Sequence, residues 1–275
     1  MSHNIIPILK ALNTDPAIIK LAEGKNIPYI GGLYKLVYDC FYPYPPAFIP
    51  IFVDDGNSSM MGLLKHWFLE RDAVIVNYDL ETAMIYEKAR NGQQFIAKLL
   101  LQMNMLEDGL TPEIREFAHI MDFKNLQAID DHAEEYGDIP NEFYKLEIIG
   151  EDPPLEYAPT LNHYKGDFPA SDELLNPDQL TKACSFEIPG EWAKEHELPT
   201  WMDKNQDKKL LFEDYLNSGQ LDKAWLTLNS RGWMISDAIQ ALGELRKHNR
   251  DPLFCVIADQ YTKGWQATDR MHLNY

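Results

Sequence analysis

The sequence predicts an α+β fold in which an antiparallel sheet with flanking helices precedes a small helical domain. Between residues 47 and 105, three short apolar runs joined by tight turns lead into an amphipathic helix. In the last quarter of the chain, apolar side chains recur at the three-to-four spacing that is typical of helices. These two patterns together define the fold class that we expect.

The predicted sheet begins with residues 47–53, which end at Asp54-Asp55-Gly56-Asn57. The Asp-Gly pair supplies the positive backbone angles that a tight hairpin needs. Residues 60–69 form the second predicted strand and residues 73–78 the third. A helix follows, and Asn91 is placed to cap it. The apolar stripe of that helix consists of Phe95, Ile96, Leu99, Leu100 and Met103.

Two short helices are predicted before the sheet, within residues 5–21. Asp15 is the expected cap of the second helix, and Pro16 occupies its first position, where a missing N–H costs nothing. Residues 34–41 fit either a helix or a strand. After residue 106 we expect another helix, followed by a polar, acidic stretch at residues 130–141.

Composition divides the chain into three predicted parts. Residues 1–150 form the sheet-containing domain and are expected to fold alone, and residues 206–275 form the helical domain. Between them, residues 151–205 read as a proline-rich linker or extended arm, because seven of the seventeen prolines fall at residues 153–199. In the helical domain, Ser236 is the predicted cap of one helix and Asp251-Pro252 opens the last one.

Three segments in the first half of the chain carry a family pattern: Phe48-Ile-Pro-Ile-Phe-Val-Asp-Asp-Gly-Asn, Gly62-Leu-Leu-Lys-His-Trp-Phe, and the helical residues from Ala89-Arg90 to Leu101. Together they resemble the SUKH superfamily. Its bacterial members are largely toxin-immunity proteins, and its fungal relatives regulate cell-wall synthesis. The resemblance implies a SUKH-like N-terminal domain and a protein that binds a partner without catalysis. An unrelated antiparallel sheet with one helix has the same pattern.

The length of 275 residues accommodates two domains with a sizeable core. The three cysteines, Cys40, Cys184 and Cys255, are far apart and form no C-x-x-C pair, which favours a reducing cytoplasm. The sequence contains no signal peptide and no membrane-spanning run that we can recognise. We therefore expect a cytoplasmic protein without a membrane partner.

The formal net charge of −18 is concentrated in residues 103–157, which we call the acidic segment. This segment holds fifteen acidic side chains and only three basic ones, so it accounts for twelve of the excess negative charges. Nucleic acid is excluded as a partner because phosphate binding needs the opposite sign. A basic protein surface is the natural complement. The alternative is an acidic face that only keeps the protein hydrated.

Catalytic signatures do not support an enzyme. The chain has no G-x-S-x-G, H-E-x-x-H, P-loop or G-x-G-x-x-G motif, and we expect neither a cofactor nor a metal. A calcium loop counted from Asp54 would need a glutamate where Lys65 stands. The one enzyme alternative is a metal-dependent hydrolase that uses the cluster at residues 130–135, where Asp131 and Glu135 share a helix face and His132 adds a nitrogen.

The function that we predict is that of an immunity protein, which occludes the basic active site of a bacterial toxin, plausibly a nuclease. A regulatory scaffold, as in the fungal branch, is a further alternative. His66 and Trp67 are expected to form an exposed recognition strip, although a core tryptophan beside a hydrogen-bonded histidine has the same sequence pattern. The residues predicted to bind the partner are Asp130, Asp131, Glu134, Glu135, Asp138, Glu142, His66 and Trp67.

Overall fold

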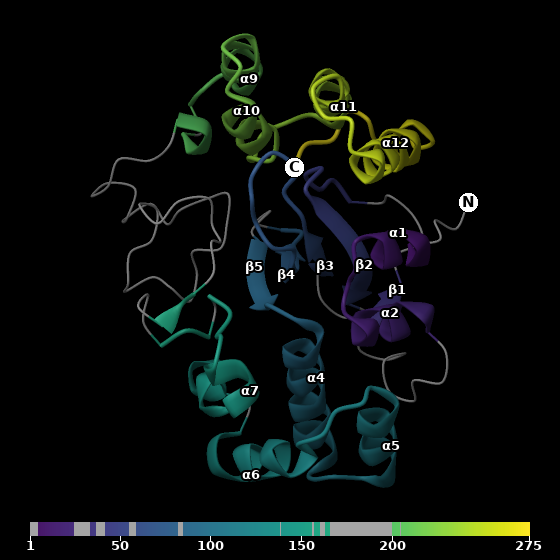
Figure 1. Cartoon of the computed structure of the whole chain (residues 1–275), viewed down its shortest axis with the longest axis vertical. Helices are drawn as coiled ribbons and strands as arrows, with labels where there is room; N and C mark the ends of the chain where they lie inside the picture. Colours follow the sequence, from purple (N-terminus) through teal and green to yellow (C-terminus); the bar gives the residue numbers. More distant parts are fainter. Residues whose placement is uncertain are drawn as a thin grey trace.

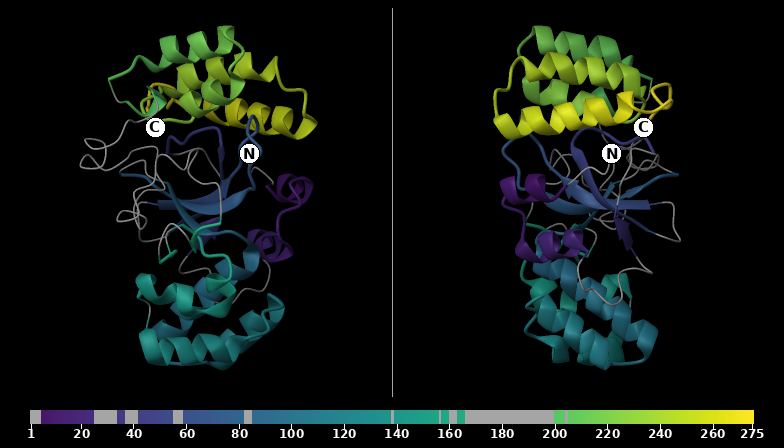
Figure 2. Two further views of the ribbon diagram at one scale, coloured as in Figure 1. Left: turned by 60° about the vertical axis from the view of Figure 1, so that its left-hand side comes forward. Right: turned by 90° about the vertical axis from the view of Figure 1, so that its right-hand side faces the viewer.

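The structure is a computed structural model, and it describes residues 5–24, 34–36, 42–54, 59–81, 85–137, 139–155, 157–159, 163–165, 200–203 and 205–275. It has the predicted α+β fold. An antiparallel sheet lies in the middle of the molecule, with one group of helices at each end (Figures 1 and 2). In the described part of the chain, no helix has the length and apolar character needed to cross a membrane.

The sheet is a meander whose five strands follow one another in sequence order, each antiparallel to the next. The strands are β1 (Tyr34–Leu36), β2 (Phe48–Asp54), β3 (Ser59–Leu64), β4 (Val74–Asp79) and β5 (Ile85–Ala89). The antiparallel pairing of β2 with β3 confirms the predicted hairpin, although its turn residues 55–58 lie outside the described residues. The second strand is shorter than predicted, and β5 was not predicted at all. The central residue of β5 is Glu87, whose side chain is fully buried. An ionisable residue at a buried position interrupts the apolar alternation by which a strand is recognised in the sequence.

Both faces of the sheet are covered, and the strand residues divide between two hydrophobic clusters. One face packs against the N-terminal helices and α4 (Gly92–Glu107), and the other packs against the C-terminal helices. The first face carries Ile49, Ile51, Met61, Leu63 and Ile75. The second face carries Phe48, Met60, Leu64, Val76 and Tyr78. The alternation follows from the pleat of the strands, in which neighbouring side chains point to opposite faces.

Helices α1 (Ile6–Ala11) and α2 (Pro16–Glu23) precede the sheet as predicted. The Asp15 carboxylate accepts a hydrogen bond from the Ala17 N–H at 2.8 Å, and the Asn91 side chain accepts one from the Gln94 N–H at 2.9 Å. Both predicted caps are therefore confirmed. The two helix starts lie against each other, because a Cβ added at Gly92 would come within 2.4 Å of the Asp15 side chain.

After α4 the chain forms α5 (Pro112–Ile120), α6 (Leu126–Tyr136), the 3-10 helix η1 (Pro140–Lys145) and α7 (Glu147–Gly150). These helices pack on α4 and make the end of the molecule that lies opposite the C-terminal helices (Figures 1 and 2). Their buried side chains continue the first hydrophobic cluster, so this end is part of the sheet's core.

The C-terminal region contains η5 (Thr200–Met202), α9 (Lys208–Asn217), α10 (Leu221–Leu228), α11 (Ile235–Arg246) and α12 (Pro252–Gln266). Asp251 caps α12 as predicted. The prediction that Ser236 caps a helix is wrong, because α11 already begins at Ile235. The Ser236 N–H, one of the first N–H groups of α11, donates to the carbonyl of Met271. The C-terminal turn therefore supplies the acceptor that a capping side chain would otherwise provide.

The C-terminal helices and the sheet share one buried cluster. Trp225, Phe254 and Trp265 pack together with the strand residues of the second face. Hydrogen bonds join the same parts, since the Asn229 side chain accepts from the Ala47 N–H and the Tyr261 hydroxyl donates to the Tyr44 carbonyl. The compositional boundary at residue 150 therefore does not mark the end of a hydrophobic core. Most of the predicted arm, residues 166–199, lies outside the described residues.

Candidate functional site

The acidic segment of the sequence folds into one end of the molecule. The described residues of this segment contribute the last turn of α4, all of α5, α6, η1 and α7, and parts of the loops between them, and these helices lie far from α9–α12 in Figure 1. We call this part the acidic end. Its exposed acidic side chains are Glu107, Asp108, Glu113, Glu116, Asp122, Asp131, Glu134, Glu135, Glu147 and Glu151. Exposed carboxylates therefore gather at this end, where Lys20 and Lys165 from outside the segment also donate hydrogen bonds, to the carbonyls of Ile120 and Glu151.

Helix α6 divides the predicted partner-binding residues between two environments. Asp131, Glu134 and Glu135 are exposed. Asp130 is half-buried, and its carboxylate accepts hydrogen bonds from the Asn104 side chain at 3.2 Å and from the Gln127 side chain at 3.4 Å. Successive residues of a helix point in different directions, so Asp130 faces α4 while Asp131 faces the solvent.

Glu142, a further predicted residue, does not lie on the exposed face of α6. Glu142, in η1, is half-buried and forms an ion pair with Lys145 at 2.7 Å. Asp138 lies outside the described residues. Three of the six predicted carboxylates, those of Asp131, Glu134 and Glu135, therefore lie on the exposed face of α6.

His132 lies on the inner side of α6, and this position argues against the metal-site alternative. Its side chain is only 5 % exposed and contacts the rings of Tyr136 and Phe143. Burial lowers the pKa of His132, which favours the neutral imidazole. Among the described residues, no group of three or more histidine, cysteine, aspartate and glutamate side chains is arranged to hold a metal ion.

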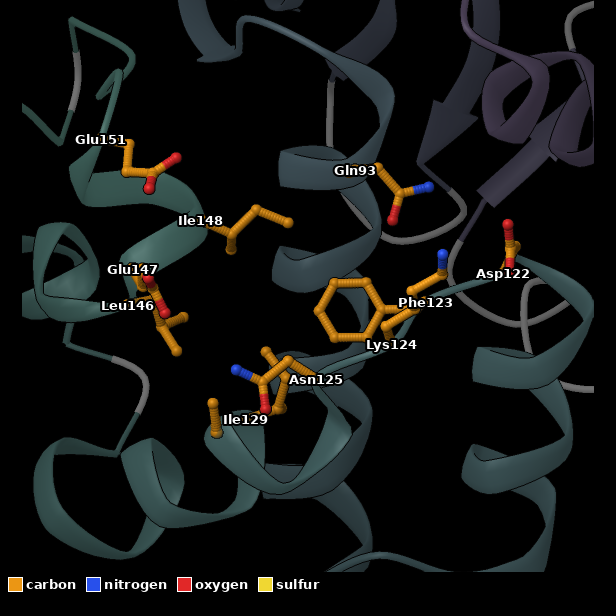
Figure 3. A pocket seen from close by; sticks show the side chains of 11 residues that line it. Gln93, Asp122, Phe123, Lys124, Asn125, Ile129, Leu146, Glu147, Ile148 and Glu151 are labelled. Atoms are coloured by element: carbon orange, nitrogen blue, oxygen red, sulfur yellow. The ribbon is translucent and has the colours of Figure 1, made fainter.

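A pocket of about 540 Å³ opens between the first turn of α4, the loop from α5 to α6, and α7 (Figure 3). Its apolar lining comes from Phe123, Ile129, Leu146 and Ile148. Its polar lining comes from Gln93, Asp122, Lys124, Asn125, Glu147 and Glu151. Pockets of this size with an apolar lining and a few polar groups are typical of ligand sites.

Gln94 fixes the two walls of this pocket relative to each other. Its side-chain amide donates hydrogen bonds to the carbonyls of Ile148, at 3.1 Å, and Asp152, at 2.8 Å. The amide oxygen accepts from the Arg90 N–H at 2.9 Å. Gln94 is almost completely buried, so these bonds hold α7 against α4 with little competition from water.

A buried network of ionisable groups lies next to the pocket, where β5 meets Asp152, Leu155 and Tyr164. The Glu87 carboxylate accepts hydrogen bonds from the Tyr164 hydroxyl at 2.7 Å and from the Leu155 N–H at 3.4 Å, and it faces the Arg90 guanidinium. Arg90 also donates to Asp152 at 2.8 Å. Burial raises the pKa of Glu87 to about 7, while the hydrogen bond from Tyr164 and the charge of Arg90 act in the opposite direction. The network ties the chain after α7 to the sheet.

His66 and Trp67 do not form the exposed strip that was predicted. His66 is 5 % exposed, and its Nδ1 accepts a hydrogen bond from the Trp225 Nε1–H at 3.1 Å. Trp67 is half-buried and packs against Phe254. The C-terminal helices cover this part of the sheet, so the two residues belong to the core and are removed from the candidate site. Burial lowers the pKa of His66 to about 3.

Comparison of the chain with known protein families, with curated proteins and with solved structures found no match. The candidate site therefore rests on the geometry of the acidic end.

Sequence reasoning identified the acidic segment but named neither the pocket nor its carboxylates Asp122, Glu147 and Glu151. The pocket is assembled from three segments that are separated along the chain, around Gln93, Phe123 and Glu147. In the sequence, Phe123 and Leu146 look like ordinary core residues. The spacing of Glu147 and Glu151, which places both on one side of a helical turn, was the one available signal.

Proposed function

We propose that this protein is a non-catalytic binding module whose acidic end binds a basic surface of a partner protein. The observation that supports the proposal is the concentration of fifteen acidic and three basic residues in a segment that forms one end of the molecule. Clustered charge of one sign accelerates association with a partner of the opposite sign and disfavours other partners.

The exposed face of α6 is the part of the acidic end that we assign to the contact. Asp131, Glu134 and Glu135 are exposed, whereas Asp130 and Glu142 are half-buried and have hydrogen-bonding or ionic partners within the chain. Asp131 accepts one surface hydrogen bond, from the neutral side-chain amide of Gln127 at 2.9 Å, and a hydrogen bond from a partner's cation would be stronger than this bond. The proposed contact is therefore narrower than the sequence alone suggested.

The resemblance to the SUKH superfamily supports a more specific form of the proposal, in which the partner is a bacterial toxin. A nuclease toxin must bind nucleic-acid phosphates and therefore has a basic active-site cleft. An acidic end that enters this cleft would block the substrate, and inhibition would need no catalytic group. In this form of the proposal the protein acts in a reducing cytoplasm, as its scattered cysteines indicate.

The experiment compares two triple variants that remove the same charge from opposite ends of the molecule. The first replaces Asp131, Glu134 and Glu135 by the corresponding amides. The control replaces Glu213, Asp214 and Asp222, which are exposed on α9 and α10. The immobilised wild-type chain is used to capture a partner from the lysate of its own host, and the partner is identified and purified.

Association and dissociation rates are then measured for all three chains at low and high salt. We expect the partner to be basic and its association rate to fall steeply with salt, because exposed charges are screened beyond about 10 Å at 0.1 M ionic strength. The α6 variant should associate roughly tenfold more slowly, with a smaller change in dissociation, and the α9–α10 control should behave like the wild type. Association that responds neither to salt nor to the α6 changes would contradict the proposed contact.

A further inference from the structure

We infer that the pocket between α4, α6 and α7 binds a long basic side chain, arginine or lysine, of the partner protein (Figure 3). This inference rests on the proposed function and names the point at which the partner is anchored. It follows from three features of the pocket: its shape, its charge, and the lack of side-chain hydrogen bonds or ion pairs between its carboxylates and the other described residues.

The shape of the pocket suits a side chain with an apolar stem. The pocket volume of about 540 Å³ exceeds that of one side chain, so a basic residue could enter with part of the flanking peptide. Phe123, Ile129 and Leu146 are buried side chains whose edges line the pocket. The methylene groups of arginine and lysine pack on apolar surfaces of this kind while the charged end remains near the rim.

The charge of the pocket suits a cation. Asp122, Glu147 and Glu151 contribute three carboxylates, and Lys124 contributes the single basic group of the lining. Glu147 and Glu151 are four residues apart, so one turn of the chain places both carboxylates on the same wall, on either side of Ile148 (Figure 3). A guanidinium group could bind to both carboxylates at once.

The paired carboxylates bind no cation directly in the described part of the chain, although the Lys165 ammonium lies near Glu151 and donates to its backbone carbonyl at 2.6 Å. Neither Glu147 nor Glu151 makes a side-chain hydrogen bond or ion pair with another described residue, and the same is true of Lys124. Asn125 lies at the N-cap position of α6, but its side chain makes no capping hydrogen bond and extends into the pocket (Figure 3). These side chains are therefore available to a ligand, whereas the Gln93 amide already donates to the Met121 carbonyl at 3.5 Å.

An anionic ligand fits this pocket less well. The start of α6 lacks a side-chain cap and would favour a negative group. A phosphate or carboxylate at that point would face three carboxylates across the pocket and only one lysine. The net negative charge of the lining therefore favours a cation over an anion.

The test uses a capped, fluorescent pentapeptide that contains two arginines, and fluorescence anisotropy at low salt measures its binding to the full chain. A peptide with two glutamates in place of the arginines is the negative probe. Ala128 lines the pocket from the first turn of α6, so Ala128→Phe fills the space without changing any charge. The double variant Glu147→Gln and Glu151→Gln removes the paired carboxylates and leaves the space open. Glu113→Gln with Glu116→Gln is the matched control, because it removes the same charge from α5, outside the pocket.

We expect the arginine peptide to bind the wild type and the glutamate peptide not to bind. Ala128→Phe should weaken binding roughly tenfold, and the Glu147 and Glu151 changes by a similar factor, while the α5 control changes it less than about twofold. Lys124→Ala should strengthen binding by roughly twofold to threefold, because it removes the one basic side chain that lines the pocket. Circular dichroism melting checks that each variant is folded, and the Glu147 and Glu151 variant decides the question if Ala128→Phe does not fold.

The outcomes separate this inference from the proposed function. If the peptide binds equally well to Ala128→Phe and the wild type, or if the α5 control weakens binding as much as the pocket variant, general attraction by the acidic end explains the binding and the pocket is not the anchor. Failure of the wild type to bind the arginine peptide also overturns the anchor. In each of these cases the proposed function still stands if the α6 face slows association with the captured partner.

Discussion

The Nδ1 atom of His66 accepts a hydrogen bond from the Nε1–H of Trp225 at 3.1 Å, across 159 residues of sequence. Trp225 is completely buried in α10, and His66 follows directly on β3 and Lys65. The bond therefore joins the sheet to the C-terminal helices in a place that water does not reach. It also fixes the histidine in its neutral form, because a protonated ring would present a second N–H to the tryptophan donor.

The first prediction concerns this histidine. Burial lowers its pKa from 6.5 to about 3, so below pH 6.5 the unfolded chain binds a proton that the folded chain does not. Folding stability should therefore be fully present above pH 6.5 and should fall as the pH decreases toward 3. Between pH 7 and pH 5 the loss from His66 should be about 2 kcal/mol.

The test variant is His66→Asn, whose side-chain oxygen can still accept from Trp225 but does not titrate. Its free energy of unfolding, measured with urea at pH 7 and pH 5, should fall less on acidification than that of the wild type. An equal fall in both proteins would show that His66 is not responsible for the acid sensitivity.

The second prediction concerns Glu87 and has the opposite sign. Burial raises its pKa from 4.5 to about 7, so between these values the folded chain holds a proton that the unfolded chain has released. The stability from this group is fully present below pH 4.5 and is lost as the pH rises through 7. Glu87→Gln keeps an acceptor for the Tyr164 hydroxyl and removes the titration.

We compare the free energy of unfolding of Glu87→Gln with that of the wild type, measured with urea at pH 5 and pH 8. The difference, variant minus wild type, should be about 2 kcal/mol larger at pH 8 than at pH 5. A difference that does not depend on pH would mean that Glu87 stays ionised in the folded protein. In that case the ion pair with Arg90 would outweigh the cost of burial.

The third prediction compares two glycines. A Cβ at Gly62 would lie 2.1 Å from the carbonyl oxygen of Ile49, in the backbone of the neighbouring strand, so Gly62→Ala must push β2 and β3 apart. We expect it to destabilise the protein by roughly 2 kcal/mol or more. Gly243 lies in α11 with nothing within 4 Å of its added Cβ. Gly243→Ala should therefore stabilise the protein by about 0.5–1 kcal/mol, because alanine favours the helix.

Thermal melting of both alanine variants provides the measurement. Similar melting temperatures for the two variants would contradict the close approach of β2 and β3 at Gly62.

The fourth prediction concerns the boundary at residue 150. A fragment of residues 1–150 lacks α10–α12 and leaves the second face of the sheet uncovered, including Phe48, Met60 and Tyr78. Although the composition of the chain suggests an independent domain, we expect this fragment to aggregate or to bind a hydrophobic dye and to melt without a cooperative transition. A single sharp transition would show that residues 1–150 form a domain by themselves.

Local sequence signals predicted much of the secondary structure. The caps Asp15, Asn91 and Asp251 act within a few residues of themselves, so they can be read without knowledge of the fold. The hairpin of β2 and β3 depends on adjacent residues in the same way. The predictions failed where a distant segment supplied the partner. Glu87 interrupts the pattern of β5 but is held by Tyr164, and the start of α11 is bonded to the C-terminal turn.

The sequence by itself determined the α+β class, the starts of α2, α4 and α12, and the concentration of acidic residues in one segment. These properties depend on periodicity, capping and charge, which are local along the chain. Only the tertiary structure decided that His66 is buried, that the C-terminal helices complete the core of the sheet, and that Gln93, Phe123 and Glu147 line one pocket. Burial and concave surfaces arise when segments that are far apart in the sequence pack together, and no local pattern specifies which segments those are.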